Sequence, residues 1–394
     1  MENTILLPDK VKKERIGIAC LLSCLYFLCM PLNIVSVLQG VSLLKLVSIL
    51  VGGILIIMLF MRENKLSFNS VHFFFFLYMI YSFAGLLISR SDYAVDTVKG
   101  MFETFIVIIL ISSKIYNQRE KRVIEWTWLI VGLICIVLGL TSKVVIGEDR
   151  TTITILNGQE DPNQFCGYFI IPILYAWERI TRKGEKFKWI YAGYIVAIIF
   201  IAFKTGSRGG LLAILIPSVF YAIMATRGIK SKVIIVFSMA VGTLIFATVL
   251  FPMLPTTVTE RFSVAQVQED KGSGRFDVWQ VLLTEVSQDK RAKVFGFGIG
   301  STQDILSDAG FIALYAHNQW IQVLTDQGSI GVLLFFLLIF SSILRNYKKN
   351  MVACAAVIGV IALSMSLTLY VFKPFLDVLL IAAMTYEGEL KYES

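Results

Sequence analysis

The sequence predicts an all-α, polytopic integral membrane protein with about twelve membrane-spanning helices and one large, partly helical loop on the outer face. Of the 394 residues, 56% are hydrophobic and only 16% are charged. The apolar residues fall in blocks of about twenty, the length that crosses a hydrocarbon core of about 30 Å. A soluble domain of this length could not bury so much apolar surface in one core. We therefore expect residues 1–394 to form a single polytopic membrane domain.

Hydropathy places the spans individually. They are expected at 16–38, 41–61, 71–89, 94–112, 123–142, 163–180, 188–204, 208–226, 231–251, 328–344, 351–371 and 374–386. The first block follows a basic segment, as a signal peptide would, but it is long enough to span and more helices follow. We interpret it as an uncleaved first span. The last block is short, and Glu387 and Glu389 follow it.

The basic residues set the orientation, because cytoplasmic loops of membrane proteins carry an excess of Lys and Arg. With the N-terminus inside, 22 of the 36 basic residues fall in inner segments and seven in the short outer segments. The alternation never breaks, which predicts that both termini are cytoplasmic. The net charge of +8 is thereby assigned to membrane orientation and not to nucleic-acid binding.

Two outer segments are too long to be simple connections, 143–161 and 252–316. In the second, which we expect to be the large extracytoplasmic loop, apolar residues recur at helical spacing. These residues are Phe276, Trp279, Leu282, Leu283 and Val286. They predict an amphipathic helix that rests on the membrane surface or on the helical bundle.

Two of the outer-face features centre on arginines. In the turn from Thr205 to Gly210, Ser207 and Arg208 lie among glycines, so the backbone can approach a ligand while the guanidinium binds phosphate oxygens. Arg275 follows Gly272-Ser273-Gly274 at the start of the amphipathic helix, where free N–H groups also attract anions. The structural alternatives are a tight helix–helix turn with an interfacial arginine, and a flexible turn with a solvated one.

Two more features are helix starts with polar side chains. His317-Asn318 leads into a helix whose dipole favours a neutral, proton-accepting imidazole. His317 is expected to share a helical face with Ile321, while Gln322 and Asp326 share another. The alternative for this histidine is a polar anchor at the membrane interface.

The last feature is Asp161-Pro162-Asn163, at the start of the sixth span. Asp at an N-cap followed by Pro at the first helical position is an ordinary helix start. The structural interpretation is therefore the simpler one for this feature, and binding of substrate is the alternative.

Other motifs carry no chemistry that we can assign. The glycines of 296–300 faintly resemble a nucleotide loop, but no strand–helix unit surrounds them. The six cysteines lie in apolar segments without a CxxC pair, and His72 and His317 are the only histidines. With no Asp-x-Asp triplet either, we expect neither a metal site nor a cofactor.

The location of the polar residues narrows the chemistry. A synthetic enzyme that works outside the cell lacks nucleotide donors, so its donor must arrive already activated. A glycan on a lipid pyrophosphate meets this need, and two arginines can offset the charge of the leaving group without a metal. A neutral histidine can take the proton from an attacking hydroxyl.

At these residues the sequence resembles the bacterial O-antigen ligase and O-antigen polymerase family, which joins lipid-linked glycans at the outer face of the inner membrane. The resemblance rests on 161–163, 207–209, 272–275 and 317–318 with Gly328 and Gly331, and it covers about 160 to 345. It implies a GT-C-like membrane glycosyltransferase that is inverting, metal-independent and located in the cytoplasmic membrane of a bacterium. The donor it implies is an undecaprenyl-pyrophosphate-linked oligosaccharide.

The resemblance also implies roles for individual residues. Arg208 and Arg275 would hold the pyrophosphate, His317 would activate the acceptor hydroxyl, and four further residues would bind substrate. These four are Ser207, Asn318, Asp161 and Asn163. The expected partners are the lipid-linked oligosaccharide, the bilayer, a flippase and a chain-length regulator.

Three functions follow in order of preference. The first is a polymerase of surface polysaccharide such as O-antigen, capsule or exopolysaccharide, because we see no extra outer domain for a bulky acceptor. The second is an O-antigen ligase that passes the glycan to a lipid or protein. A flippase or transporter of lipid-linked sugars is third. Such proteins favour ionisable residues at mid-span and internal repeats, whereas this sequence has few mid-span charges and we find no repeat in it.

Overall fold

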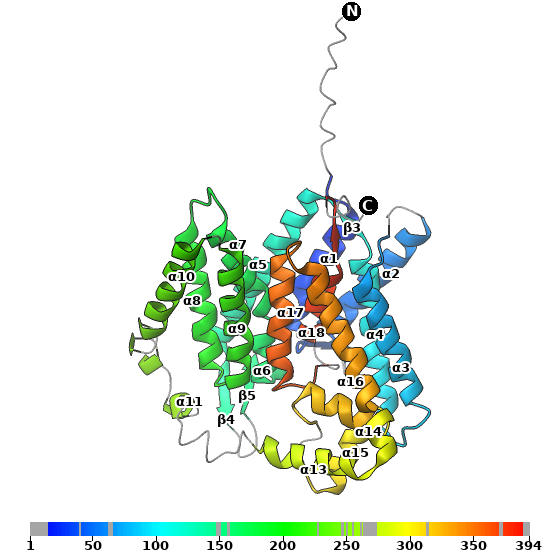
Figure 1. Ribbon diagram of the computed structural model, residues 1–394. Helices are drawn as coiled ribbons and strands as arrows, with labels where there is room; N and C mark the ends of the chain where they lie inside the picture. Colours follow the sequence, from blue (N-terminus) through cyan, green and yellow to red (C-terminus); the bar gives the residue numbers. More distant parts are fainter. Residues whose placement is uncertain are drawn as a thin grey trace, which may run out of the picture.

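The computed structural model describes residues 15–38, 41–61, 66–146, 151–155, 158–226, 228–245, 248–249, 251–253, 256–260, 262, 274–312, 315–369 and 373–388. The helices of the main bundle lie side by side (Figure 1). They are α1 (Ile18–Cys29), α2 (Leu43–Phe60), α3 (Ser70–Gly85), α4 (Ala94–Ser112), α5 (Gln118–Thr141), α6 (Pro162–Gly167), α7 (Ile170–Thr181), α8 (Lys188–Lys204), α9 (Arg208–Ala225), α10 (Ile229–Ile245), α16 (Gln319–Asn346), α17 (Met351–Ser364) and α18 (Lys373–Ala383).

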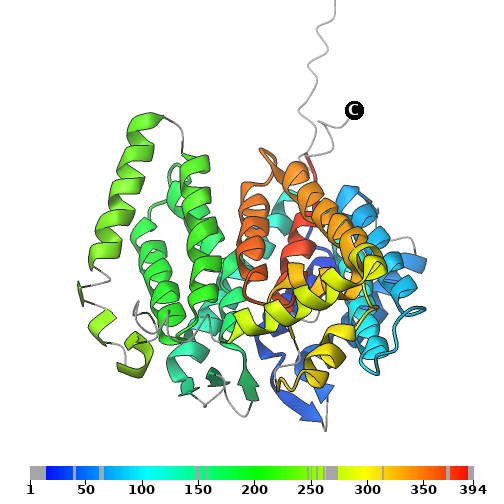
Figure 2. The same cartoon turned by 60° about the horizontal axis from the view of Figure 1, so that its bottom comes forward.

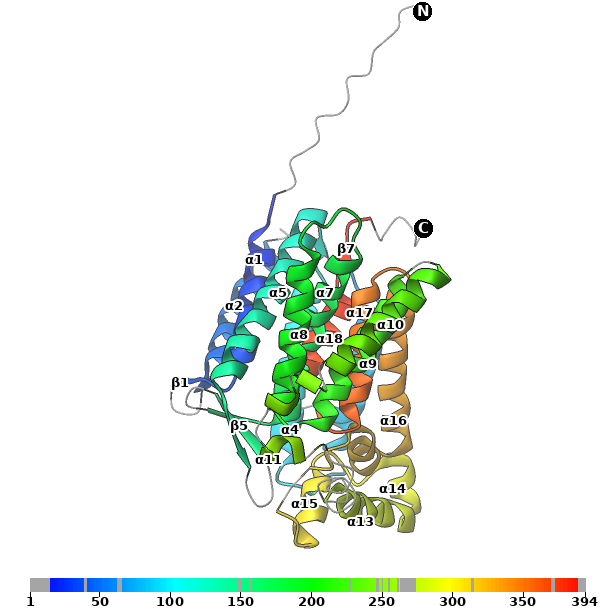
Figure 3. The ribbon, with the colours of Figure 1, turned by 90° about the vertical axis from the view of Figure 1, so that its left-hand side faces the viewer.

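Further helical elements connect the helices of the bundle or cover one of its ends. They are η1 (Met30–Leu32), η3 (Phe251–Met253), α11 (Thr256–Glu260), α13 (Arg275–Gln288), α14 (Lys290–Phe295) and α15 (Ser301–Asp308). The helices α13, α14 and α15 cover one end of the bundle, which we call the site end (Figures 1 and 3). The first and last described residues lie at the other end, which we call the tail end.

A described helix overlaps each of the apolar segments that the sequence marks as a span. Helices α4 and α8 coincide with the expected 94–112 and 188–204. Four described helices are each long and apolar enough to cross a membrane: α2, α5, α9 and α16. Four shorter apolar stretches accompany them. The prediction of a mostly helical membrane protein with several spans is thus confirmed.

Three expected spans differ from the observed helices for local reasons. The first helix ends at Cys29, because Pro31 begins a 3-10 turn. The span at 163–180 is divided into α6 and α7, because Pro172 cannot donate to the carbonyl of Tyr168 one turn earlier. Helix α16 begins at Gln319 and is kinked at Gly328, whose φ is 65°.

A few short strands accompany the helices of this mostly helical protein. The outer segment after α5 forms an antiparallel sheet in the order β4 (Lys143–Ile146), β5 (Thr151–Ile155) and β6 (Gly158–Glu160). The strands β1 (Ser36–Leu38) and β2 (Val41–Ser42) pair antiparallel, while β3 (Ile115–Tyr116) and β7 (Thr385–Tyr386) pair parallel. Sequence hydropathy missed these strands because they are only two to five residues long.

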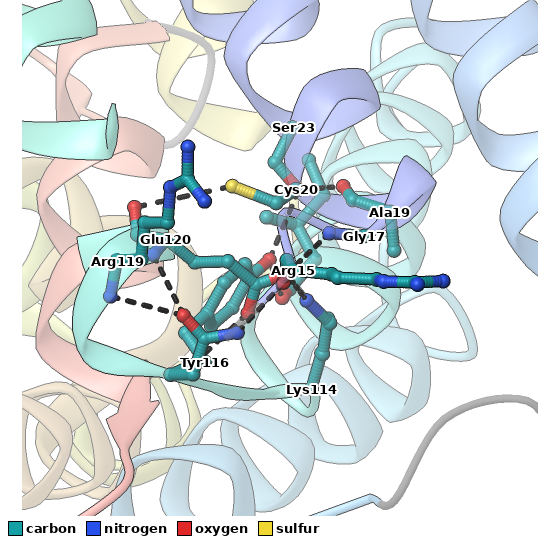
Figure 4. A network of polar contacts seen from close by, with 11 residues as sticks. Arg15, Gly17, Ala19, Cys20, Ser23, Lys114, Tyr116, Arg119 and Glu120 are labelled. Atoms are coloured by element: carbon teal, nitrogen blue, oxygen red, sulfur yellow. Dashed lines mark hydrogen bonds and ion pairs between the residues drawn. The ribbon is translucent and has the colours of Figure 1, made fainter. Parts of the chain in front are cut away.

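A buried polar network fixes the tail end (Figure 4). One carboxylate oxygen of Glu120 accepts from the backbone N–H of Gly17 at 3.0 Å and pairs with Lys114, and the other accepts from Asn117 N at 3.0 Å. A buried charge is tolerated only when it is paired and hydrogen-bonded, as it is in this network. The network therefore ties the start of α1 to the start of α5.

Helix α17 occupies the middle of the bundle and packs against α7, α9, α16 and α18. Its buried face carries small side chains, Ala353, Ala356 and Gly359, so that neighbouring helices can approach closely. A Cβ on Gly359 would lie only 2.9 Å from the carbonyl oxygen of Ala213 in α9. This tight packing fixes where the loop after α17 emerges at the site end.

Candidate functional site

The start of α6 holds two of the predicted site residues. Asp161 caps the helix, and its Oδ1 accepts from Asn163 N at 2.8 Å and from Gln164 N at 3.3 Å. The side-chain amide of Asn163 also donates to Asp161 Oδ1, at 3.1 Å. Pro162 at the first helical position leaves no unused donor there. Asp161 is therefore an N-cap, as the structural interpretation of the sequence expected.

The start of α9 is bonded directly to the start of α6. Ser207 caps α9 by accepting from Gly210 N at 2.9 Å, and its hydroxyl donates to Asn163 Oδ1 at 2.7 Å. A buried chain of hydrogen bonds thus runs from Asp161 through Asn163 to Ser207. Arg208 is the first residue of α9, where the helix dipole and the guanidinium both attract an anion.

A third segment contacts this turn, the loop 364–369 after α17. Gly209 packs so closely on it that an added Cβ would collide with the side chain of Ser366, and would lie 3.0 Å from Asn163 Oδ1. Glycine is required here because the loop occupies the space that any side chain would need.

The histidine segment precedes α16. Asn318 is the N-cap, and its Oδ1 accepts from Trp320 N at 3.0 Å and from Ile321 N at 3.3 Å. His317 therefore lies outside the helix, with a φ of 48° in the left-handed region. The expectation that it shares a helical face with Ile321 is wrong, because helical geometry begins two residues later. Its imidazole is 8% exposed.

The residue before His317 is held from both sides. The carbonyl of Ala316 accepts from Trp279 Nε1 of α13 at 2.7 Å. The N–H of Ala316 donates to Gln322 Oε1 at 3.0 Å. With Asn318 fixed as the N-cap, the backbone on either side of His317 is pinned, which permits an unfavourable φ at this residue.

The same loop, 364–369, also contacts the start of α16. Leu369 N donates to Gln319 Oε1, and Thr368 Oγ1 donates to Gln322 Oε1 at 3.3 Å. Trp320 Nε1 donates to Ser364 Oγ at 2.8 Å. One loop therefore joins the Ser207-Arg208-Gly209 turn to the His317-Asn318 segment. This loop was missed from the sequence, although serines and a threonine interrupt the apolar run of 351–371.

The polar face predicted on α16 is present. Gln322 Nε2 donates to Asp326 Oδ2 at 3.2 Å. Asp326 Oδ1 accepts from both the N–H and the hydroxyl of Thr302, at 2.9 and 2.7 Å. All three residues are buried. This face therefore bonds α15 to α16, and through Gln322 it also holds the residue before His317.

Arg275 approaches the site from α13. It is the first residue of that helix, after Gly274 with a φ of 73°; Gly272 and Ser273 lie outside the described residues. Val278 and Leu282 of α13 pack with Ala316. Trp279, one turn beyond Arg275, makes the hydrogen bond to Ala316. Arg275 therefore begins the helix that holds Ala316, the neighbour of His317. Figure 2 shows that this helix, α13, lies across the site end.

Glu160 belongs to the site and was missed. It is the last residue of β6, directly before the Asp161 cap, and is only 6% exposed. Its Oε2 is buried with no hydrogen-bond partner. Burial, together with the neighbouring charge of Asp161, raises the pKa of Glu160 to about 8. The sequence offers no signal for this burial beyond the position of Glu160 next to Asp161.

The remaining candidates are structural. His72 lies near the tail end, where its Nδ1 accepts from Asn69 N in a capping box and its Nε2 contacts Ser112. Lys204 donates to three carbonyls at the end of α5. Gly296 packs against the backbone of Asp326 and Gln327, which agrees with discounting 296–300 as a nucleotide loop. Among the described residues, no three His, Cys, Asp or Glu side chains gather as metal ligands.

The bundle and its polar end define a class, a multi-pass helical membrane protein with capped helix starts and a buried histidine at one end. Residues 193–336 match the family model described as O-antigen ligase. The match contains Ser207, Arg208, Arg275, His317 and Asn318, and it confirms the resemblance that the motifs indicated. The residues of the α6 start lie outside the matched range.

This chain is similar to a curated relative and to a solved structure. The relative is the ComP-specific O-oligosaccharyltransferase of Acinetobacter baylyi (strain ATCC 33305 / BD413 / ADP1), 23% identical over 300 residues. These residues are 69% of this chain and 54% of the relative, so the chain spans about half the length of that protein. The structure, entitled "Structural coordination of polymerization and crosslinking by a peptidoglycan synthase complex", aligns with a TM-score of 0.46 and 14% identity over 80% of this chain and 95% of that one.

Proposed function

We propose that this protein is a membrane glycosyltransferase that moves an oligosaccharide from undecaprenyl pyrophosphate to an acceptor at the outer face of a bacterial cytoplasmic membrane. One observation carries the proposal. A single loop, 364–369, contacts both the helix start that presents Arg208 and the start of α16, which directly follows His317 and Asn318. An anion site beside a buried histidine is the arrangement that displacement of a pyrophosphate leaving group requires.

The chemistry follows from the groups present. Arg208 and Arg275 bind the pyrophosphate, whose charge grows as the anomeric C–O bond breaks. His317 takes the proton of the acceptor hydroxyl while that oxygen bonds to the anomeric carbon. The lipid pyrophosphate leaves with the electron pair of the broken bond, and attack from the opposite side inverts the anomeric centre. Asn163 and Ser207 hold the starts of α6 and α9 together for substrate binding, and Asn318 fixes the start of α16.

The proposed reaction needs no divalent metal, because the arginines carry the charge compensation that a metal would supply. Purified protein in proteoliposomes is therefore expected to transfer glycan at an unchanged rate in excess EDTA. A rate that falls on chelation and recovers with added Mg²⁺ or Mn²⁺ would contradict this part of the mechanism.

The acceptor divides the family into ligases and polymerases. The sequence argument favours a polymerase, whereas the description of the matching family model and the printed name of the relative both support a ligase. We therefore propose ligation as the activity of this chain. Polymerisation is the second candidate, which the sequence argument favours.

Proteoliposomes loaded with the lipid-linked oligosaccharide of the host distinguish the two activities. A polymerase uses a second donor molecule as acceptor, so the glycan chains on the lipid carrier lengthen although no separate acceptor is added. A ligase leaves them unchanged until an envelope fraction from a host strain lacking this protein supplies the acceptor. Transfer in neither condition, with intact donor recovered, would contradict the proposed function.

A further inference from the structure

The outer face of α13 carries an uncharged groove that the proposed chemistry does not use. Phe276, Trp279, Gln280, Leu283, Thr284 and Ser287 line it, with a volume of about 450 Å³. The rings of Phe276 and Trp279 meet edge to face with centroids 5.4 Å apart. The opposite face of α13, with Val278, Leu282 and Val286, is buried against the rest of the site end.

The lining has the mixed chemistry of a sugar-binding surface. Aromatic faces accept the C–H groups of a pyranose ring, while an amide and hydroxyls bond its oxygens. Phe276 is 56% exposed and Leu283 is 43% exposed. Such exposure of apolar side chains beside polar ones is typical of a binding surface rather than of a packed core.

The charges beside the groove indicate which occupant fits. Asp277 and Glu285 lie on the adjoining side of α13, where they line a second hollow. Acidic residues repel anionic lipid headgroups. An uncharged stretch of glycan meets no such penalty, so the charges favour a glycan over a bilayer.

One lining residue of the groove contacts the segment that holds His317. This residue, Trp279, donates to the carbonyl of Ala316, the residue before His317. Arg275, which would hold the pyrophosphate, stands directly before Phe276. From residue 276 to 287 the helix advances about 16 Å, at 1.5 Å per residue, which is longer than one sugar ring. A donor anchored through its pyrophosphate at Arg275 can therefore extend its glycan along α13.

We infer that this groove binds the sugars of the lipid-linked donor beyond the one attached to pyrophosphate; the inference rests on the proposed function. The groove then selects donors by the length and identity of their glycan, whereas Arg208, Arg275 and His317 act on the pyrophosphate and the first sugar.

The test compares two donors and two matched variants in proteoliposomes. The donors are the host's full-length lipid-linked oligosaccharide and undecaprenyl-pyrophosphate-GlcNAc, which carries a single sugar. Phe276→Ala is expected to raise KM for the full-length donor by about tenfold with kcat unchanged, because it removes an aromatic sugar contact. It should leave KM for the single-sugar donor unaltered. Phe295→Ala is the control, since Phe295 is 46% exposed in the same loop but lies outside the groove.

The inference would be overturned if Phe276→Ala and the wild type had the same KM for the full-length donor. It would also be overturned if Phe276→Ala changed KM equally for both donors. A binding measurement separates this failure from that of the proposed function. A Leu283→Cys variant labelled with an environment-sensitive dye should respond to the full-length donor whether or not turnover occurs. Quenching of that dye by brominated lipid in place of a donor response would assign the groove to the bilayer and would also overturn the inference.

Discussion

His317 has a left-handed backbone conformation, with a φ of 48°, which is uncommon for residues other than glycine, although asparagine, aspartate and histidine adopt it more often than the rest. Such conformations cost on the order of 1–3 kcal/mol and persist where the surroundings impose them. Here the bonds of Ala316 to Trp279 and Gln322, and the cap at Asn318, impose it. Strain that is held this firmly fits a residue whose side chain must point in one direction.

His317→Asn is expected to abolish transfer while leaving donor binding near normal. Asparagine tolerates a positive φ, so the backbone should survive, but its amide cannot take up a proton. Loss of a general base costs a factor of about 100 to 10,000 in rate. Single-turnover transfer and donor affinity, measured on the same preparation, check this. Normal transfer by the variant would refute the base assignment, and lost donor binding would move His317 to the pyrophosphate site.

Glu160 makes stability depend on pH. Burial raises its pKa to about 8 from an ordinary 4.5, so the folded protein retains a proton that the unfolded chain has lost. Where the folded state binds more protons, stability falls as pH rises. The contribution is complete below the ordinary pKa of the carboxyl and is lost as pH rises through about 8.

The unfolding temperature of the wild-type protein in detergent is therefore expected to fall between about pH 6 and about pH 9 more than that of Glu160→Gln, which stays neutral. Glu285→Gln, at an exposed position on α13, is the control and should follow the wild type. Parallel curves for wild type and Glu160→Gln would show that this carboxyl does not titrate in that range.

At the scale of elements, the site consists of three helix starts, those of α6, α9 and α16, arranged around one loop. Each start is capped by a short polar side chain, Asp161, Ser207 or Asn318. Converging N-termini concentrate partial positive charge and free N–H groups, which is favourable for an anionic ligand. The loop 364–369 sets their spacing, because it contacts α9 and α16 at once.

Gly209→Ala is expected to reduce transfer strongly, because its Cβ would collide with Ser366 and force α9 away from the loop. The matched control is Gly193→Ala in α8, where an added Cβ meets nothing within 4 Å. In a helix interior that control should be neutral or stabilising by up to about 1 kcal/mol. Activity and unfolding temperature of both variants check the idea, which fails if Gly209→Ala behaves like Gly193→Ala.

The helix starts were predictable from sequence because capping depends only on residues close together in the chain. The caps concerned are Asp161-Pro162, Ser207 and Asn318. The contact between Gly209 and Ser366 was not, because the two residues are far apart in the chain. Hydropathy averaged over a span also hid the break that Pro172 causes between α6 and α7. The burial of Glu160 depends on packing around β6, and neighbouring residues do not encode it.

At the scale of the whole molecule, the two ends differ in basic residues. Lys114, Lys121, Arg179, Arg182 and Arg345 lie at the tail end, where Arg179 and Arg182 pair with Glu125. Acidic partners alter the positive-inside rule little, because the rule counts Lys and Arg and not net charge. The tail end is therefore expected to face the cytoplasm, as the alternation of loops in the sequence predicts. Twelve spans with both termini inside stay a prediction of the same argument.

Labelling of introduced cysteines tests this orientation. Lys290→Cys in α14 and Lys186→Cys between α7 and α8 are both exposed positions, at the site end and the tail end respectively. A membrane-impermeant maleimide is expected to label Cys at position 290 in intact spheroplasts, and Cys at position 186 only after permeabilisation. The parent protein is the background control, because five of its six cysteines are buried and the sixth is half-buried. The reverse pattern would place the arginines and His317 on the cytoplasmic side. There the argument for a lipid-pyrophosphate donor loses its basis, because nucleotide-activated sugars are present.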